Sequence, residues 1–290
     1  MRAGKPSRTA DQNALFRALE ALRPAPVRVA DDRLAVRFLS PEFRLLAGAA
    51  RLGAARRLLE VVIDSRWPCA RPGVVARTRL IDQVVLRELG RVEQVLILGA
   101  GLDSRALRLP GMDRVRVFEV DHPATQAAKR RALSRDGQPA GHVTFVPVVF
   151  GADDLAAALT AAGFTAGAPS LVLWEGVTNY LNRQAVDETF GLLASMLGSG
   201  SVLLFTYVDA RMLDGSADFA GAKTTMRAVR RVGEPFTFGF APPEVPGYLA
   251  DRGFELAWDE RVSDAARRFY PPGKCPAAPA YYHVAESRRR

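Results

Sequence analysis

Residues that build metal centres and disulfide frameworks are scarce in this chain of 290 residues, which contains two cysteines and three histidines. Cys69 and Cys275 share no metal-type spacing, and so few histidines do not suggest a zinc site. We therefore expect no bound metal and a reducing, cytoplasmic setting.

Long apolar runs are also missing. No stretch approaches the ~18 apolar residues that cross a bilayer, and the opening MRAGKPSRTADQ lacks the apolar segment of a secretory signal. The sequence thus predicts no membrane contact. The apolar fraction of 48% still provides for a large core, which fits one α/β domain with an elaboration, or at most two domains.

Positive charge is unevenly distributed. The formal net charge is +9, and residues 1–75 hold fourteen Lys or Arg against seven Asp or Glu. This excess is typical either of the solvated surface of Arg-rich helices or of a site for an anionic small molecule. Nucleic acid is not favoured as a partner, because no basic motif is interleaved with aromatic residues.

Helical periodicity dominates the first ninety residues. Asp11 is expected to cap a first helix, which Pro24 and Pro26 would end. Pro41 begins another long segment with apolar residues at helical spacing, and a further helix fits from about Val74 to Leu89. The sequence therefore predicts a helical N-terminal cap.

Strands and helices alternate after this region. Strand-like runs lie at 94–98, 114–120, 142–150, 170–176 and 201–208, with helical stretches at 122–135, 152–162 and 182–197. Later helices are expected near 216–231 and 243–252, and later strands at 254–260 and 281–287. Strands joined through helices predict a doubly wound, mostly parallel, Rossmann-like α/β sheet. We expect a cap over residues 1–75 and a core over 76–290, with a substrate-side insertion at about 209–250.

A glycine turn follows the first expected strand. The segment VLILGAGLDSRALRL (95–109) runs from an apolar strand into Gly99, Ala100 and Gly101, and the next strand ends at Asp121. Glycine permits positive φ and close approach of a ligand, and a carboxylate at the tip of the second strand can accept from ribose hydroxyls. The pattern predicts an adenosine-containing cofactor.

The identity of that cofactor depends on the rest of the turn. Ser104 stands where a dinucleotide-binding fingerprint has its third glycine, which weakens a nicotinamide oxidoreductase without excluding it. A methyltransferase needs only the glycine turn, an acid ending the second strand and an acid near the fourth. Glu175 supplies the last of these.

Four segments, including the glycine turn, appear in a characteristic order: VVARTRLID, VLILGAGLDSRALRLP, VFEVDHPATQAAKRRAL and LWEGVTNYL. Together with GEPFTFGFAPPEVPGYLADRGF (233–254), they resemble the leucine carboxyl methyltransferase-like family of class I S-adenosylmethionine (SAM) enzymes, over roughly residues 8–255. The resemblance implies SAM as the cofactor and S-adenosylhomocysteine as its product.

The resemblance also assigns roles to four residues. Arg77 would hold the methionine carboxylate of SAM through a charge-assisted contact. Gly99 would begin the loop beneath the methionine moiety, and Asp121 would accept from the ribose hydroxyls. Glu175 would lie near the methionine amino group.

One position departs from the family pattern. After the third strand, family members commonly carry an Asp that accepts from the adenine amino group, followed by an apolar residue. This chain has Val149 and Phe150 there, and valine cannot accept that hydrogen bond. Asp153 or Asp154 would have to replace it through a shifted loop, or Phe150 would stack on the adenine.

No general base stands out for the transfer step. An ionised carboxylate needs none, whereas a phenol does. His122, His142 and His283 each suit structural roles, so we expect no catalytic residue of this kind. Candidate acceptor contacts come from the basic cap and the region after the fifth strand: Arg8, Tyr180, Tyr207, Arg227 and Tyr270.

Three functional hypotheses follow. The first is a SAM-dependent O-methyltransferase that forms a methyl ester on a small acidic metabolite, for example one of polyketide type. The second is a methyltransferase acting on a protein C-terminal carboxylate or on modified tRNA. The third is a nicotinamide-dependent oxidoreductase.

Overall fold

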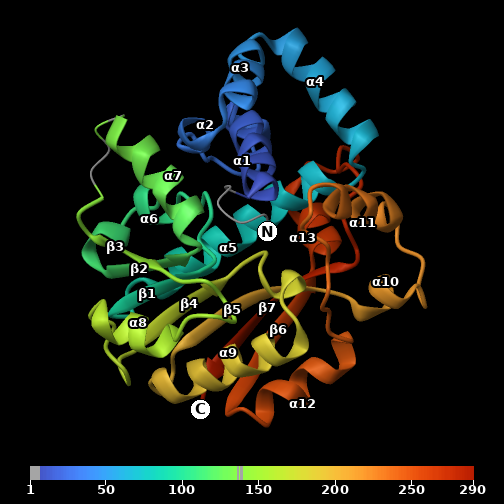
Figure 1. The fold of residues 1–290 in the computed structure, drawn as a ribbon. Helices are drawn as coiled ribbons and strands as arrows, with labels where there is room; N and C mark the ends of the chain where they lie inside the picture. Colours follow the sequence, from blue (N-terminus) through green and yellow to red (C-terminus); the bar gives the residue numbers. More distant parts are fainter. Residues whose placement is uncertain (1–6, 136, 138–139) are drawn as a thin grey trace.

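The computed structural model describes residues 7–135, 137 and 140–290 (Figure 1). Seven strands in these residues form one sheet in the order β3-β2-β1-β4-β5-β7-β6. The strands are β1 (Gln94–Leu98), β2 (Arg116–Asp121), β3 (Val143–Pro147), β4 (Ser170–Trp174), β5 (Val202–Val208), β6 (Phe254–Arg261) and β7 (Tyr282–Arg289). Strands β1 to β5 pair in parallel, and β7 is antiparallel to both neighbours. This confirms the predicted doubly wound, mostly parallel sheet.

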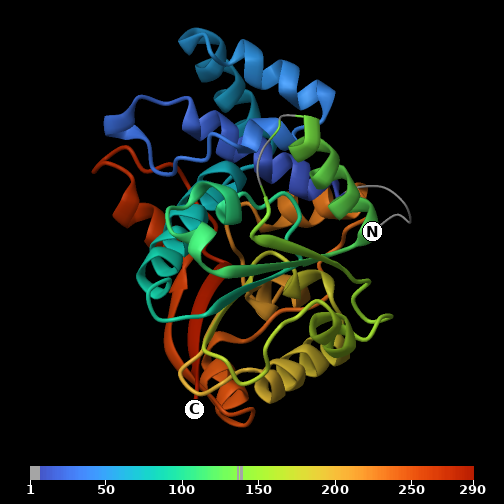
Figure 2. The same cartoon turned by 90° about the vertical axis from the view of Figure 1, so that its left-hand side faces the viewer.

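The helices lie on both faces of the sheet and over its carboxyl edge (Figures 1 and 2). They are α1 (Arg8–Ala21), α2 (Ala35–Phe38), α3 (Pro41–Ala49), α4 (Gly53–Arg66), α5 (Ala70–Glu88), α6 (Arg105–Arg108), α7 (Pro123–Arg135), α8 (Leu155–Ala161), α9 (Arg183–Met196), α10 (Ala210–Asp214), α11 (Ala222–Arg231), α12 (Val245–Ala250) and α13 (Val262–Phe269).

The central strands are apolar on both sides, as a covered parallel sheet requires. In β1, Val95 and Ile97 pack into the core on the side of α5 and α13, whereas Leu96 and Leu98 pack into the core on the side of α8, α9 and α12. A third core joins the cap helices to α5 and α7. The strand order reverses between β1 and β4, and this switch point is where doubly wound sheets bind ligands.

Three local predictions were wrong. Ser7, not Asp11, caps α1, because its hydroxyl accepts from the Ala10 N–H at 3.1 Å. Asp11 instead accepts from the Ser40 N–H at 3.0 Å. The segment that begins at Pro41 is two helices separated by a turn at 50–52.

The third error concerns the helix expected over 216–231, which in the structure begins only at Ala222. Gly215 and Gly221 both have positive φ, of 76° and 78°. An α-helix cannot continue through this conformation, so α10 ends before Gly215 and α11 begins after Gly221.

Candidate active site

The glycine turn after β1 has the conformation that its sequence requires. Gly99 and Gly101 have positive φ, of 66° and 49°, and a Cβ on Gly99 would overlap Val177 Cγ2. Ala100 between them is fixed by its N–H, which donates to the Val120 carbonyl at 2.9 Å. The turn therefore presents backbone at the carboxyl edge of the sheet, and Gly99 is required both by its positive φ and by the close approach of Val177.

Asp121 ends β2 directly beside this turn. Its carboxylate accepts from the Gly101 N–H and from the His122 N–H. Burial raises the pKa of Asp121, although these backbone donors oppose the shift. A carboxylate has lone pairs for further donors, so Asp121 can still accept from ribose hydroxyls.

Glu175 follows β4 and lies between two arginines. One carboxylate oxygen accepts from Arg77 Nε at 2.5 Å, and the other accepts from Arg105 Nη1 at 2.6 Å. Burial alone would raise the pKa of Glu175, but the two guanidinium groups outweigh it and lower the pKa. Glu175 is therefore ionised at neutral pH and can meet an ammonium group.

Arg105 continues this ion network away from Glu175. It donates to Asp82 at 2.8 Å and to Asp103 at 2.5 Å, and Arg108 also donates to Asp82, at 2.7 Å. Burial would raise the pKa of Asp103, but Arg105 and then Lys129 lower it to about 2. These residues tie α5, the glycine turn and β4 together.

Asp82, Asp103 and Arg105 were not among the predicted site residues, although they lie within the motifs that carry the family resemblance. The signal was present in the segments RTRLID and LDSR, where charged residues interrupt apolar patterns. A charge in a region that must be buried requires a partner, and here the two motifs are partners of each other.

The donor set fits the methionine end of SAM, which carries a carboxylate and an ammonium group. Among the described residues, Arg77 gives only its Nε donor, to Glu175, while its guanidinium lies 4.8 Å from the ring centroid of Tyr282. Its terminal nitrogens can hold a carboxylate, and Glu175 beside it can accept from the ammonium. The residues present therefore suit the cofactor that the sequence predicted.

The turn after β3 contains the position that departs from the family pattern. The Val149 N–H donates to Asp153 Oδ2 at 2.8 Å, and Asp154 caps α8 by accepting from the Ala157 N–H. Both candidate replacement carboxylates therefore hold local backbone. Phe150 packs at the margin of the core beneath this turn.

We expect Val149→Asp to tighten SAM binding about fivefold, because one restored hydrogen bond contributes about 1 kcal/mol. Isothermal titration calorimetry would measure the change. Val149→Asn is the matched control, since its amide oxygen accepts without added charge beside Asp153. Weaker binding by both variants would mean that another group already accepts from the adenine.

A cavity of about 110 Å³ includes Arg77 in its lining. It is lined mainly by α1, α5 and α11, by the segment that follows β4, and by the start of β7. The lining residues are Thr9, Gln12, Asn13, Phe16, Trp67, Ala70, Gly73, Val74, Arg77, Gly176, Tyr180, Thr225, Ala228, Val229, Phe236, Val262, Pro279, Tyr281 and Tyr282. We name it the acceptor cavity. Six of these nineteen residues are aromatic, and the polar groups other than Arg77 are neutral.

The five candidate acceptor contacts are spread across the molecule. Tyr180 lines the acceptor cavity and packs edge-on against Phe236 at 5.3 Å. Tyr207 is buried in β5, and its hydroxyl donates to Asp259. Tyr270 is buried in the core near α13.

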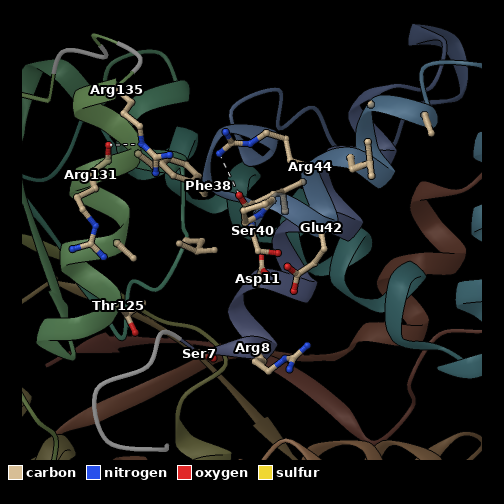
Figure 3. Close-up of a pocket in the computed structure, with 18 residues that line it drawn as sticks. Ser7, Arg8, Asp11, Phe38, Ser40, Glu42, Arg44, Thr125, Arg131 and Arg135 are labelled. Atoms are coloured by element: carbon tan, nitrogen blue, oxygen red, sulfur yellow. Dashed lines mark hydrogen bonds between the residues drawn. The ribbon is translucent and has the colours of Figure 1, made fainter.

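The two arginines among those candidates are exposed. Arg227 lies on α11, whose residues Thr225 and Ala228 line the acceptor cavity. Arg8 lies at the start of α1 and lines a separate groove of about 980 Å³ between the cap and α7 (Figure 3). Helix α1 contributes residues to both spaces and stands between them.

The three histidines have contacts that fix local structure. His122 Nδ1 accepts from the Ala124 N–H, and His142 Nε2 lies 2.7 Å from the Ala106 carbonyl. His283 Nδ1 lies 2.8 Å from Asp259. The residues that line the acceptor cavity include no histidine.

Two features are absent from residues 7–135, 137 and 140–290. No group of three or more His, Cys, Asp or Glu side chains is placed to hold a metal ion. None of the helices combines the length and apolar character needed to cross a bilayer.

Comparison with known proteins gives consistent matches. A family model described as leucine carboxyl methyltransferase matches residues 10–194. A Mycolicibacterium gilvum protein, provisionally named an S-adenosyl-L-methionine-dependent methyltransferase, is 38% identical over 61% of this chain and 60% of its own length. A Mycobacterium tuberculosis protein with the same provisional name is 35% identical over 57% of this chain and 50% of its own. The match thus spans about half of these relatives, or slightly more.

Solved structures agree in fold. A provisionally named methyltransferase from Thermobifida fusca has a TM-score of 0.57 and 16% identity, and the match covers 100% of this chain and 97% of that one. An O-methyltransferase family protein from Burkholderia thailandensis has a TM-score of 0.50 and 16% identity, over 90% and 77% of the two chains. At this identity the likeness concerns the fold alone.

Proposed function

The chain belongs to the leucine carboxyl methyltransferase family, whose cofactor is SAM, and from this we propose that it transfers a methyl group from SAM to the carboxylate of a small acidic molecule. The family and cofactor predicted from the sequence are confirmed, and SAM replaces the nicotinamide alternative. The observation that carries the acceptor proposal is the acceptor cavity beside Arg77, with neutral donors and no histidine.

The proposed roles of the residues follow from the positions of their side chains. Arg77 and Glu175, which pair with each other, would bind the carboxylate and the ammonium of the methionine end, and Asp121 beside the glycine turn would hold the ribose. Bound SAM supplies a sulfonium methyl group that is already activated for displacement. The protein therefore has to position the acceptor in line and exclude water, which the aromatic walls of the acceptor cavity can do.

The size of the acceptor cavity favours a small reacting group. A cavity of ~150 Å³ is known to hold one benzene ring, so about 110 Å³ admits a carboxyl group with a similarly small attachment. Gln12, Asn13 and Thr225 offer N–H and O–H donors to such a carboxylate. Burial raises the pKa of Tyr180, so its hydroxyl stays protonated and donates rather than acting as a base.

The basic cap contributes less to this site than its composition suggested. Arg17 pairs with Asp32, Arg23 with Glu60, and Arg71 with Asp64, at 2.5 to 2.8 Å. Arg77 is the cation in the cavity lining. The proposal of an acidic acceptor therefore rests on the neutral donors and the missing base, not on attraction by the cap.

We expect the product to be a methyl ester, which mild alkali hydrolyses to methanol. The single-turnover rate should be flat from about pH 6 to 8, because a carboxylate with a pKa near 4 is already ionised there. Tyr180→Phe should retain the rate within about tenfold, since a donor is removed but no base. Mass spectrometry would identify the product, and rapid-quench assays across pH would measure the single-turnover rates of the unmodified chain and of Tyr180→Phe.

Three results would contradict this proposal. A product methylated on a phenol, nitrogen or carbon would exclude a carboxylate as the methyl acceptor. A rate that rises about tenfold per pH unit would indicate a general base. Turnover confined to a protein C-terminal peptide or to tRNA would assign the site to the macromolecular alternative.

A further inference from the structure

Helices α3 and α4 expose large apolar side chains at one end of the molecule. Six of the eight exposed large apolar residues in the described chain lie between residues 45 and 62. They are Leu45, Leu46, Leu52, Leu58, Val61 and Val62. Figures 1 and 2 show α3 and α4 projecting beyond the sheet and the other helices. We name these six residues, with the two helices that carry them, the apolar hairpin.

The exposure follows from the sequence pattern of α4. Leu59 and Ile63 face inward and pack into the core of the cap. Leu58, Val61 and Val62 recur at intervals of three and four residues and form a second stripe on another face. Leu52, in the turn before α4, extends this stripe with 72% of its surface exposed. The helix is therefore apolar on two faces, of which the fold covers one.

Positive charge surrounds this stripe. The exposed charged residues of α3, α4 and the turn between them are four arginines and one carboxylate: Arg44, Arg51, Arg57, Arg66 and Glu42. Within the described residues, Arg51 and Arg57 form no ion pair. Across the groove, α7 adds Arg131 and Arg135 on the facing wall (Figure 3).

We propose that the apolar hairpin docks on an anionic lipid bilayer, with its aliphatic side chains among the acyl chains and its arginines at the headgroups. A helix surface with leucines on one side and arginines around it is the pattern of interfacial membrane binding. Each arginine near an anionic surface adds favourable energy, whereas a second copy of this chain would bring the same arginines against each other. This proposal departs from the sequence-based expectation of no membrane contact, which rested on the missing membrane-spanning run; association with the surface needs no such run.

The position of the hairpin gives this docking a consequence for the site. Helix α4 ends at Arg66, and the next residue, Trp67, lines the acceptor cavity. The docking surface is therefore joined to the wall of the acceptor cavity directly through the end of α4. The inference concerns binding alone and does not depend on the proposed acceptor.

Co-sedimentation of the full chain with vesicles tests this proposal. We expect vesicles of phosphatidylcholine with about one third phosphatidylglycerol to bind at least tenfold more protein than vesicles of phosphatidylcholine alone. Binding should fall about tenfold between low salt and about 0.3 M NaCl, because added salt screens the arginines. Leu52→Asn with Leu58→Asn, and separately Arg51→Gln with Arg57→Gln, should each reduce binding at least fivefold.

Matched controls lie away from the hairpin. Leu86→Asn and Arg91→Gln change an exposed leucine and an exposed arginine elsewhere, and they should bind vesicles like the unmodified chain. Equal binding to both kinds of vesicle, or binding that the hairpin substitutions leave unchanged, would overturn the proposal. So would a dimer in light scattering that Leu52→Asn with Leu58→Asn dissociates, because the hairpin would then be covered by a second copy.

Discussion

Arg105→Met is expected to lower the free energy of unfolding by about 3–5 kcal/mol, the usual loss when one partner of a buried ion pair is removed. Arg105 is 3% exposed and donates to Asp82, Asp103 and Glu175. Methionine fills similar space but leaves these buried carboxylates with fewer donors. Urea unfolding at pH 7 would measure the loss. Arg91→Met, at an exposed arginine 3.8 Å from Glu88, should cost less than about 1 kcal/mol.

The pH dependence separates lost charge pairing from lost packing. In the unmodified protein the pKa of Asp103 is about 2, below the ordinary value of 3.8. Its carboxylate therefore stabilises the fold fully above pH 3.8, and this contribution is lost as the pH falls towards 2. Without Arg105 the pKa rises and the loss begins at higher pH. The difference in free energy of unfolding between the unmodified protein and Arg105→Met should be largest at neutral pH and shrink near pH 3. A difference caused by lost packing would instead stay constant with pH.

The fold could be predicted because its signals are local. Each parallel strand is a short apolar run, and the glycine turn follows β1 as the sequence indicated. Errors occurred where a tertiary contact decided the outcome. Asp11 has the chemistry of a helix cap, yet it holds the Ser40 backbone, which belongs to a distant segment.

The proposed binding residues of the cofactor site were accessible through motifs, but their partners were not. Arg77, Asp121 and Glu175 stand at recognisable positions, whereas the link between Arg105 and Asp82 joins two motifs 23 residues apart. Spacing along a chain does not say which charges meet after folding. The acceptor cavity is the extreme case, since α1, α11 and β7 contribute to it from distant parts of the sequence.

For the apolar hairpin, the sequence pattern indicates which residues are apolar but not which of them the fold covers. Leu58 and Leu59 are adjacent leucines on one helix, but Leu58 faces solvent and Leu59 packs into the cap. An apolar residue at helical spacing indicates that some surface will cover it. Only the packed structure distinguishes a face that covers the core of this chain from one left open to a partner.

Arg77→Met is expected to weaken SAM binding by about 10- to 100-fold and to leave adenosine binding within about twofold. Charge-assisted hydrogen bonds to a carboxylate contribute about 1.5–3 kcal/mol, and adenosine has no carboxylate for Arg77 to hold. The SAM affinity of Arg77→Lys should fall between those of the unmodified protein and Arg77→Met, because an ammonium keeps the charge but loses the planar pair of donors. Isothermal titration calorimetry with both ligands measures each difference directly.

Asp121→Ala provides the matched control for this comparison. Asp121 lies at the glycine turn, where both ligands place a ribose, so its loss should weaken SAM and adenosine alike by about 1.5–3 kcal/mol. The two variants thus divide the cofactor into halves: Arg77 acts on the methionine end, and Asp121 on the nucleoside. If Arg77→Met weakened both ligands equally, Arg77 would act by holding Glu175 and the end of β4 in place, and the methionine carboxylate would need another partner.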